Sequence, residues 1–209
     1  MSKLLIRTED RIVAKALEMF NEKGIEYVGL RELATTLGMR VGNITYYFPT
    51  KDDLVNRLSL DFSDLNSTLI VENADLSMQS FLEMLQKVFN NHVSYRCLLL
   101  SFVHLMKQNK VMALRYKKTQ LDRNATLKSN LNLLVKQSYL KVEDESEIEF
   151  LISSIALVSR FWISEAAISF RQWSTEQQIA HYLTIIVKIL MPYATAKGRK
   201  ELTIFTKGI

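Results

Sequence analysis

Apolar residues recur at helical intervals along most of the chain, and no segment shows the sustained alternation of a β-strand. Residues Leu54, Leu58, Phe62, Leu65 and Leu69 follow one another at intervals of three or four, which places them on one side of a helix. A second such stripe runs along the C-terminal region through Ile179, Leu183, Ile186, Val187 and Leu190. The pattern predicts an all-α protein.

Glycine and proline divide this helical chain unevenly. Gly24, Gly29, Gly38 and Gly42 crowd the first fifth of the sequence, and the next glycine is Gly198. The two prolines, Pro49 and Pro192, flank a tract of long helical periodicity. Because both residue types interrupt helices, we expect short helices and tight turns up to residue 48 and long helices afterwards.

The boundaries of about nine helices can be placed from caps and turn residues. Thr8 is expected to cap the first helix, Thr50 the fourth, and Ser174 with Gln177 to form a capping box for the last. We predict helices over residues 8–23, 30–37, 41–48, 51–69, 77–91, 92–106, 109–140, 144–172 and 175–196. The sequence is divided into a three-helix domain at 1–50 and a larger helical domain at 51–209.

Composition narrows the class of protein. The longest apolar window, 150–170, is interrupted by Arg160 and Glu165, and the N-terminus reaches Glu9 and Asp10 before a signal-peptide core can form. We therefore expect a cytoplasmic protein without a membrane segment. The net charge of +5 is compatible with a polyanionic partner.

The chemistry-bearing residues do not indicate an enzyme. Cys97 lies in an apolar run and is predicted to be a buried thiol, and His92, His104 and His181 share no metal-ligand spacing. We find no paired catalytic carboxylates, no nucleophile with a nearby base and no phosphate-binding glycine loop. No catalytic residue, metal or cofactor is expected.

Two short helices joined by a glycine-containing turn are typical of a DNA-binding helix-turn-helix. The second helix of the pair, over 41–48, would enter the major groove. Its outward residues, with the lysine just beyond it, are Arg40, Asn43, Thr45, Tyr46, Tyr47 and Lys51. Asn43 can read an adenine edge and Thr45 a thymine methyl or a base acceptor, whereas tyrosine hydroxyls and a lysine can bind phosphate.

Residues 8–60 resemble the TetR family of bacterial regulators. The resemblance rests on Ala16-Leu-Glu-Met-Phe20, Leu30-Arg-Glu-Leu-Ala34 and above all on Gly42-Asn-Ile-Thr-Tyr-Tyr-Phe-Pro-Thr-Lys-Asp-Asp-Leu54. It implies a three-helix DNA-binding domain on a larger ligand-responsive domain that dimerises through its last two helices. By position, Arg31, Asn43 and Thr45 are the candidates for base contacts, and Tyr46, Tyr47 and Lys51 for phosphate contacts.

The chain also departs from this family. Arg40, Val41 and Thr45 stand where serine, lysine and tyrosine are common, and Gly29 stands where a serine or threonine often caps the second helix. The operator sequence therefore cannot be carried over from the resemblance. Two alternatives stay open at this point, that Tyr47 packs against the larger domain and that Arg31 pairs with a carboxylate.

The larger domain is expected to form a homodimer and to bind a small-molecule effector. Apolar stripes on both C-terminal helices are wider than one core face requires, which favours a four-helix interface between two copies. Such a dimer would present two recognition helices to a palindromic site in double-stranded operator DNA. The candidate effector residues are Phe81, Met84, Tyr95, Phe102, Met106, Tyr116, Arg160 and Trp162, although such stripes are also typical of plain core.

Residues 96–141 contain ten basic residues against the single acid Asp122. This segment is either a solvated basic face or a region that attracts an anionic effector or DNA. Taken together, the sequence predicts a repressor that an effector releases from its operator. The alternatives are a ligand-independent dimeric DNA-binding protein and an activator.

Overall fold

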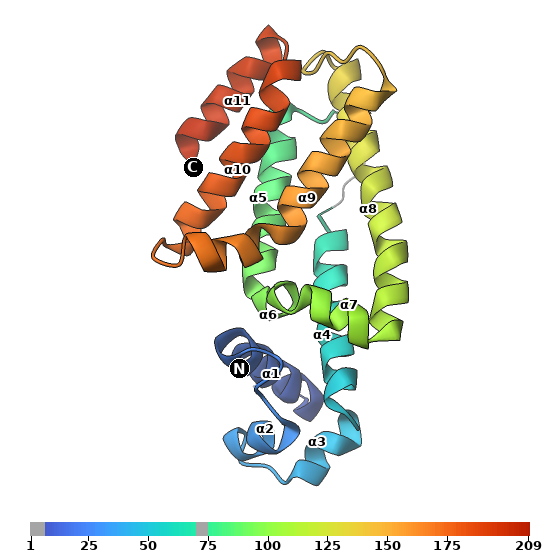
Figure 1. Ribbon diagram of the computed structural model, residues 1–209, viewed down its shortest axis with the longest axis vertical. Helices are drawn as coiled ribbons and strands as arrows, with labels where there is room; N and C mark the ends of the chain where they lie inside the picture. Colours follow the sequence, from blue (N-terminus) through green and yellow to red (C-terminus); the bar gives the residue numbers. More distant parts are fainter. Residues whose placement is uncertain (1–6, 70–74) are drawn as a thin grey trace, which may run out of the picture. The chain divides into compact units, whose positions relative to one another are not determined.

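A computed structural model describes residues 7–69 and 75–209, and this described part of the chain is all-α. The first six residues, which contributed to the signal-peptide argument, lie outside it. The described residues form eleven α-helices, somewhat more than the nine predicted, and one short 3-10 helix (Figure 1). Their bounds are α1 Thr8–Lys23, α2 Leu30–Thr36, α3 Val41–Tyr47, α4 Lys51–Ser67, α5 Met78–Ser94, α6 Arg96–Leu100, α7 Phe102–Gln108, α8 Lys110–Lys136, α9 Glu145–Ser169, α10 Thr175–Leu190, η1 Met191–Tyr193 and α11 Ala196–Gly208.

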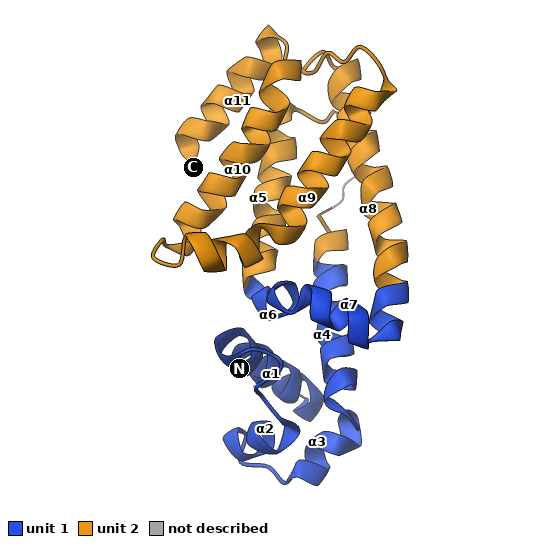
Figure 2. Cartoon of the chain, in the orientation of Figure 1, with its two compact units in different colours: residues 1–65, 94–114 blue, residues 66–93, 115–209 orange. Residues whose placement is uncertain are grey.

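The chain folds into two compact units, coloured separately in Figure 2. Unit 1 comprises residues 1–65 and 94–114, and unit 2 comprises residues 66–93 and 115–209. The chain passes from one unit to the other within α4 and α8 and at the end of α5. The functional division at residues 50 and 51, which was drawn from the motif, stays a prediction.

Unit 1 is built on the apolar faces of its short N-terminal helices. Ile12, Ala16 and Leu54 are fully buried, and Phe20 and Leu33 almost so. The α1 helix packs against α2 and also against α6. The short helices are therefore held by shared core residues, since helices of one or two turns are unstable in isolation.

Unit 2 is organised around the antiparallel pair α9 and α10, which lie side by side (Figure 1). Leu131, Leu151 and Leu183 are fully buried at its centre. Among the described helices, α9 alone is long and apolar enough to cross a membrane by length and composition. Its buried residues, among them Ile148, Leu151, Ile155 and Trp162, form part of the unit 2 core.

The predicted caps are mostly confirmed. Ser174 and Gln177 form the capping box of α10, and the Thr50 hydroxyl accepts from the backbone N–H of Asp53 at 3.2 Å at the start of α4. The prediction for α1 is wrong by one residue: Thr8 is the first helical residue, and Arg7 occupies the cap position without a capping hydrogen bond.

Two predicted helices are wrong in extent. The helix predicted over 92–106 is interrupted, because Tyr95 leaves the helical region and a new helix, α6, starts at Arg96. The last predicted helix ends at Leu190, and Thr195 then caps an additional helix, α11, through the backbone N–H of Gly198. Cys97 is buried as predicted, and burial raises the pKa of its thiol to about 12.

Candidate nucleic-acid interface

The turn between α2 and α3 depends on a glycine. Gly38 has a φ of +65°, in the left-handed region that β-carbon sterics disfavour for other residues. The N–H of Gly38 donates to Thr35 at 3.1 Å, and the N–H of Met39 donates to Ala34 at 2.9 Å. These bonds satisfy carbonyls at the end of α2, and the chain enters α3 after four intervening residues.

The two turns of α3 have one buried and one exposed face. Ile44 is fully buried and anchors the helix to the core of unit 1. Arg40, Asn43 and Tyr46 are exposed, and the side chain of Tyr46 is 81% exposed. A side chain left this open contributes little to the core of unit 1 and is accessible to an external partner.

The remaining predicted residues of α3 lie at the edge of this face. Tyr47 is 40% exposed, and its ring meets that of Tyr46 edge to face at a centroid distance of 5.0 Å. Thr45 is half-buried, and its hydroxyl donates to the carbonyl of Gly42 at 3.4 Å. Thr45 is thus less available to an external partner than Asn43 or Tyr46.

Arg31 on α2 is exposed, and it forms no ion pair within the described part of the chain. The neighbouring carboxylate, Glu32, pairs instead with Lys23 at 2.7 Å. The alternative that Arg31 serves a structural ion pair therefore finds no support in this structure.

Lys51 has a structural contact that the sequence did not reveal. Its ammonium donates to the carbonyl of Ile25 at 2.8 Å and to that of Glu26 at 3.4 Å, both in the turn that follows α1. The lysine thereby joins the start of α4 to this turn. An ammonium has three donors, so this contact does not prevent an additional one.

Two further polar residues position the interface and were missed by the sequence analysis. Arg57 on α4 forms ion pairs with Glu9 on α1 and, at 2.8 Å, with Asp61 on its own helix. Asn21 at the end of α1 accepts from the backbone N–H of Cys97 and donates to the carbonyl of Ser94. The spacing of four residues between Arg57 and Asp61 is typical of an ion pair along a helix and could have been noticed in the sequence. The hydrogen bonds of Asn21 join residues that are far apart in the sequence, so no local pattern indicates them.

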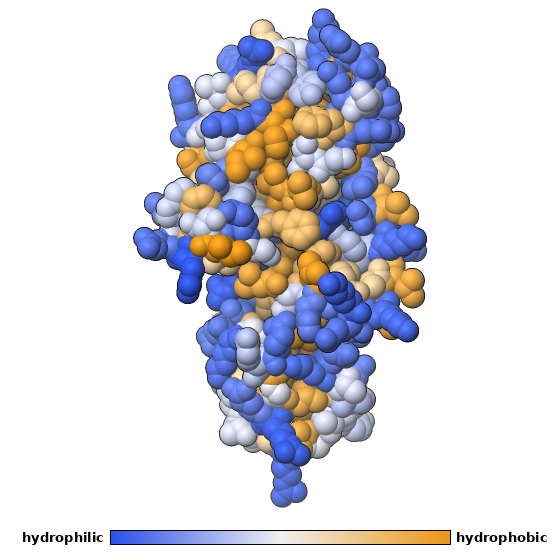
Figure 3. Space-filling view, viewed as in Figure 1, coloured by the Kyte–Doolittle hydropathy of each residue, from blue (hydrophilic) through white to orange (hydrophobic). Residues whose placement is uncertain are grey.

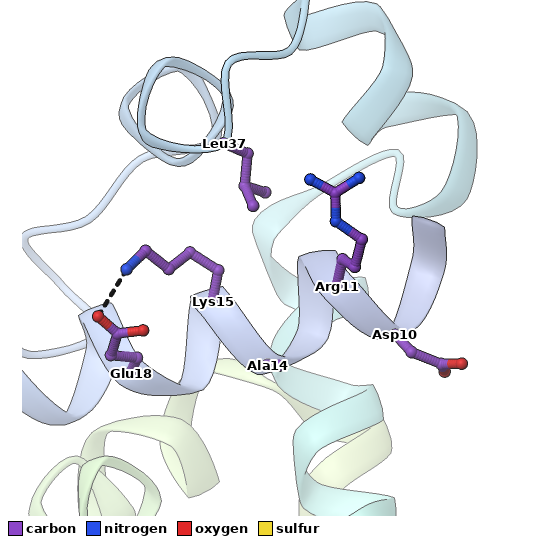
Figure 4. Close-up of a pocket in the computed structure, with 6 residues that line it drawn as sticks. All are labelled: Asp10, Arg11, Ala14, Lys15, Glu18 and Leu37. Carbon is purple, nitrogen blue, oxygen red and sulfur yellow. Dashed lines mark hydrogen bonds and ion pairs between the residues drawn. The ribbon is translucent and has the colours of Figure 1, made fainter. Parts of the chain in front are cut away.

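A surface hollow in unit 1 lies between α1 and the end of α2 (Figure 4). Its lining residues are Asp10, Arg11, Ala14, Lys15, Glu18 and Leu37, and Lys15 pairs with Glu18 across one end. The hollow is open and four of its six residues are charged. It therefore lacks the enclosure that buries most of a small ligand.

The eight candidate effector residues do not belong to one unit. Tyr95, Phe102 and Met106 lie in unit 1, whereas Phe81, Met84, Tyr116, Arg160 and Trp162 lie in unit 2. Within unit 2, the guanidinium of Arg160 lies 5.8 Å from the centroid of the Tyr116 ring. Phe81 is fully buried, as expected of a core residue.

The fold and the α2–α3 geometry define a helix-turn-helix DNA-binding protein. Residues 12–58 match the family described as "Bacterial regulatory proteins, tetR family", and residues 64–202 match "Bacterial transcriptional repressor" of the TetR type. Since the second match alone covers more than half of the chain, the protein belongs to the TetR family of DNA-binding transcriptional regulators, which are not enzymes.

Individual relatives agree with this assignment. The chain is 28% identical over 137 residues to the probable HTH-type transcriptional regulator YttP of Bacillus subtilis (strain 168), a match that covers 65% of this chain and 61% of that protein. Among solved structures, a TetR-family regulator from Marinobacter aquaeolei VT8 superposes with a TM-score of 0.90 at 18% identity, over 97% of this chain and 98% of that one. PfmR from Thermus thermophilus has a TM-score of 0.66 at 15% identity, over 87% and 98% of the two chains. At these identities the structures show a shared fold.

Proposed function

We propose that this protein is a cytoplasmic homodimeric repressor that binds a palindromic operator through α3 and is released by a small-molecule effector bound in unit 2. The observation that carries the DNA-binding part is the exposed face of α3, where Asn43 and Tyr46 project from a helix anchored by buried Ile44. In this proposal, Arg31, Asn43 and Thr45 contact bases, Tyr46, Tyr47 and Lys51 contact phosphates, and Arg40 lies at the start of the same helix.

Dimerisation through the C-terminal helices is supported by apolar surface on α9. Phe150, Leu157 and Ile168 lie on this helix at intervals of seven and eleven residues, and Leu157 and Ile168 are 59% and 80% exposed. Those intervals place them on one side of the helix. Figure 3 shows apolar side chains gathered over α9 and α10 on the visible face. A second copy would cover this stripe and bring two α3 helices to one duplex.

Selection of binding sites from random duplex DNA tests the proposal. The native protein should enrich a palindrome, and Asn43→Ala should relax the preference at one position of each half-site. Tyr46→Phe, which removes the hydroxyl alone, should weaken binding to all sites alike. Asn132→Ala, the same change at an exposed position of α8 in unit 2, is the matched control. Failure of the folded native dimer to enrich any site would contradict sequence-specific regulation.

Effector release requires that the ligand bind the two conformational states unequally. Once an operator is selected, a ligand that saturates unit 2 should weaken operator affinity, and fluorescence anisotropy of labelled DNA measures the change. An unchanged affinity would exclude release and leave a ligand-independent DNA-binding protein. A ligand that strengthened binding would indicate activation or co-repression.

A further inference from the structure

Unit 2 contains partly buried positive charge that no carboxylate of the described residues balances. On α8, Tyr116 and Arg123 are seven residues apart and therefore lie on the same side of the helix. Both are half-buried. Burial lowers the pKa of the Arg123 guanidinium, and the nearby charge of Arg160 lowers it further. Two like charges from α8 and α9 thus share a partly desolvated region.

Arg160 reaches this region from α9. Its guanidinium carbon lies 5.8 Å from the centroid of Tyr116 and 5.9 Å from that of Phe161, within range of cation–π contact. Near the start of α8, the Nη1 atom of Arg115 is buried and has no hydrogen-bond partner among the described residues. Across residues 7–69 and 75–209, none of Arg115, Arg123 and Arg160 forms an ion pair with a carboxylate.

This arrangement differs from that of the other basic residues of the same helix. Lys117 and Lys118 are exposed, and Lys128 pairs with Glu145. The basic segment noted in the sequence therefore contains two kinds of residue. Lys117, Lys118 and Lys128 are exposed to solvent, whereas Arg115 and Arg123 are partly buried. A solvated cation costs the fold little, whereas a partly buried cation without a counter-charge destabilises it.

An aromatic cluster adjoins the arginines. The positive charge of Arg123 acts on the buried imidazole of His92, which accepts a hydrogen bond of 3.0 Å from Trp162. The Trp162 ring stacks on Phe89 at a centroid distance of 5.0 Å and meets the Tyr182 ring at 5.6 Å. The hydroxyl of Tyr182 is buried and has no partner among the described residues. Charge, apolar surface and unmet hydrogen-bonding groups thus occur together in one unit.

We propose that Arg123 and Arg160 bind the oxyanion of an amphipathic effector, a carboxylate or a phosphate, whose apolar part packs near Trp162. Tyr116, whose ring lies 5.8 Å from the Arg160 guanidinium carbon, flanks this oxyanion. The assignment rests on the proposed function of unit 2 as the effector domain and names the chemical class of its ligand. A planar guanidinium suits this task because it can donate two parallel hydrogen bonds to a carboxylate or phosphate.

Ligand binding can be tested without DNA. The chain has two tryptophans, so Trp173→Phe leaves Trp162 as the sole indole reporter. Octanoate and octyl phosphate are titrated separately, below their aggregation concentrations, with octanol and octylamine as neutral and cationic controls. At least one anion should change the Trp162 fluorescence saturably and raise the Tm, while both controls should do neither. Binding of octanoate alone identifies a carboxylate site, and binding of octyl phosphate alone a phosphate site.

Substitutions then locate the anion. Arg123→Gln and Arg160→Gln should each weaken binding of the anion by about tenfold or more, whereas Lys117→Gln, which removes one positive charge from the exposed side of α8, should not. The inference would be overturned if neither octanoate nor octyl phosphate bound saturably. It would also be overturned if Arg123→Gln and Lys117→Gln lost affinity for the anion to the same extent. If the anion binds as expected but operator affinity is unaffected, the site stands and the proposed release mechanism fails.

A measurement on the ligand-free protein guards against misfolded variants. Because Arg123 is partly buried and has no carboxylate partner among the described residues, Arg123→Met should raise the Tm of the ligand-free protein. A lowered Tm would show that the arginine stabilises the fold by itself and would overturn its assignment as a ligand-binding residue.

Discussion

The indole N–H of Trp162 donates a hydrogen bond of 3.0 Å to Nδ1 of His92, and both side chains are buried. Since Nδ1 accepts this bond, a neutral imidazole must carry its proton on Nε2. Protonation of Nδ1 would break the bond and place a charge beside Arg123. Burial lowers the pKa of His92 to about 3, and the charge of Arg123 acts in the same direction. His92 is therefore a neutral hydrogen-bond acceptor in the folded state.

This histidine should make stability depend on pH. Its pKa is 6.5 when exposed in the unfolded chain and about 3 in the folded one, so between these values the unfolded state binds more protons. The contribution is fully present above pH 6.5 and is lost as pH falls toward 3, at roughly 1 kcal/mol per pH unit. This contribution is measured by comparing thermal unfolding of the native chain and of His92→Gln across this pH range. Glutamine keeps a hydrogen-bond acceptor at this position but does not titrate. Equal losses in both proteins from about pH 6.5 to about pH 5 would contradict the assignment.

Gly198 in α11 should be intolerant of substitution. A β-carbon at this position would lie 2.1 Å from the carbonyl oxygen of Tyr139, a backbone atom that cannot move independently. Gly198→Ala should therefore destabilise unit 2 by about 3 kcal/mol, measured as the free energy of unfolding in urea. Gly208→Ala, in the same helix but with no atom within 4 Å of the added carbon, should be neutral or slightly stabilising. Similar losses in both variants would show that the backbone of α11 can adjust.

The local features of the fold could be predicted from sequence because they depend on neighbouring residues. The φ of Gly38, the capping box of Ser174 and the burial of Ile44 all follow from short-range patterns. The extra helix α11 could not be predicted in this way. It is held by tertiary contacts, among them the hydrogen bond from the Thr195 hydroxyl to the carbonyl of Ser138 at 2.7 Å.

The candidate sites show the same difference. The exposed residues of α3 could be identified because their outward positions follow from the helical period once Ile44 is placed inside. The hydrogen bond from Lys51 to the carbonyl of Ile25 could not be predicted, since the two residues are twenty-six positions apart in the sequence. Likewise, Arg115 and Arg123 read as members of one basic run, and only the packing of α8 distinguishes them from exposed Lys117.

The apolar stripe of α9 provides a test of dimerisation. Leu157→Glu places a charge in the proposed interface, where burial against a second copy would be strongly unfavourable. We expect a monomer by analytical ultracentrifugation and a large loss of affinity for a palindromic operator. Leu114→Glu, at a leucine that is 73% exposed in unit 1, should leave the dimer intact. A Leu157→Glu variant that remains dimeric would place the interface elsewhere.

Lys51 is expected to serve both the fold and the DNA. Lys51→Met removes the hydrogen bonds to the carbonyls of Ile25 and Glu26 and should lower the free energy of unfolding by about 1 kcal/mol. If its remaining donor binds a phosphate, the slope of log K against log salt concentration for operator binding should also become shallower by about one. Lys23→Met is the control for stability, because Lys23 and its partner Glu32 form a surface ion pair of small energetic value. A stability loss with an unchanged salt slope would limit Lys51 to joining α4 to the turn after α1, and the phosphate contact proposed for it would be wrong.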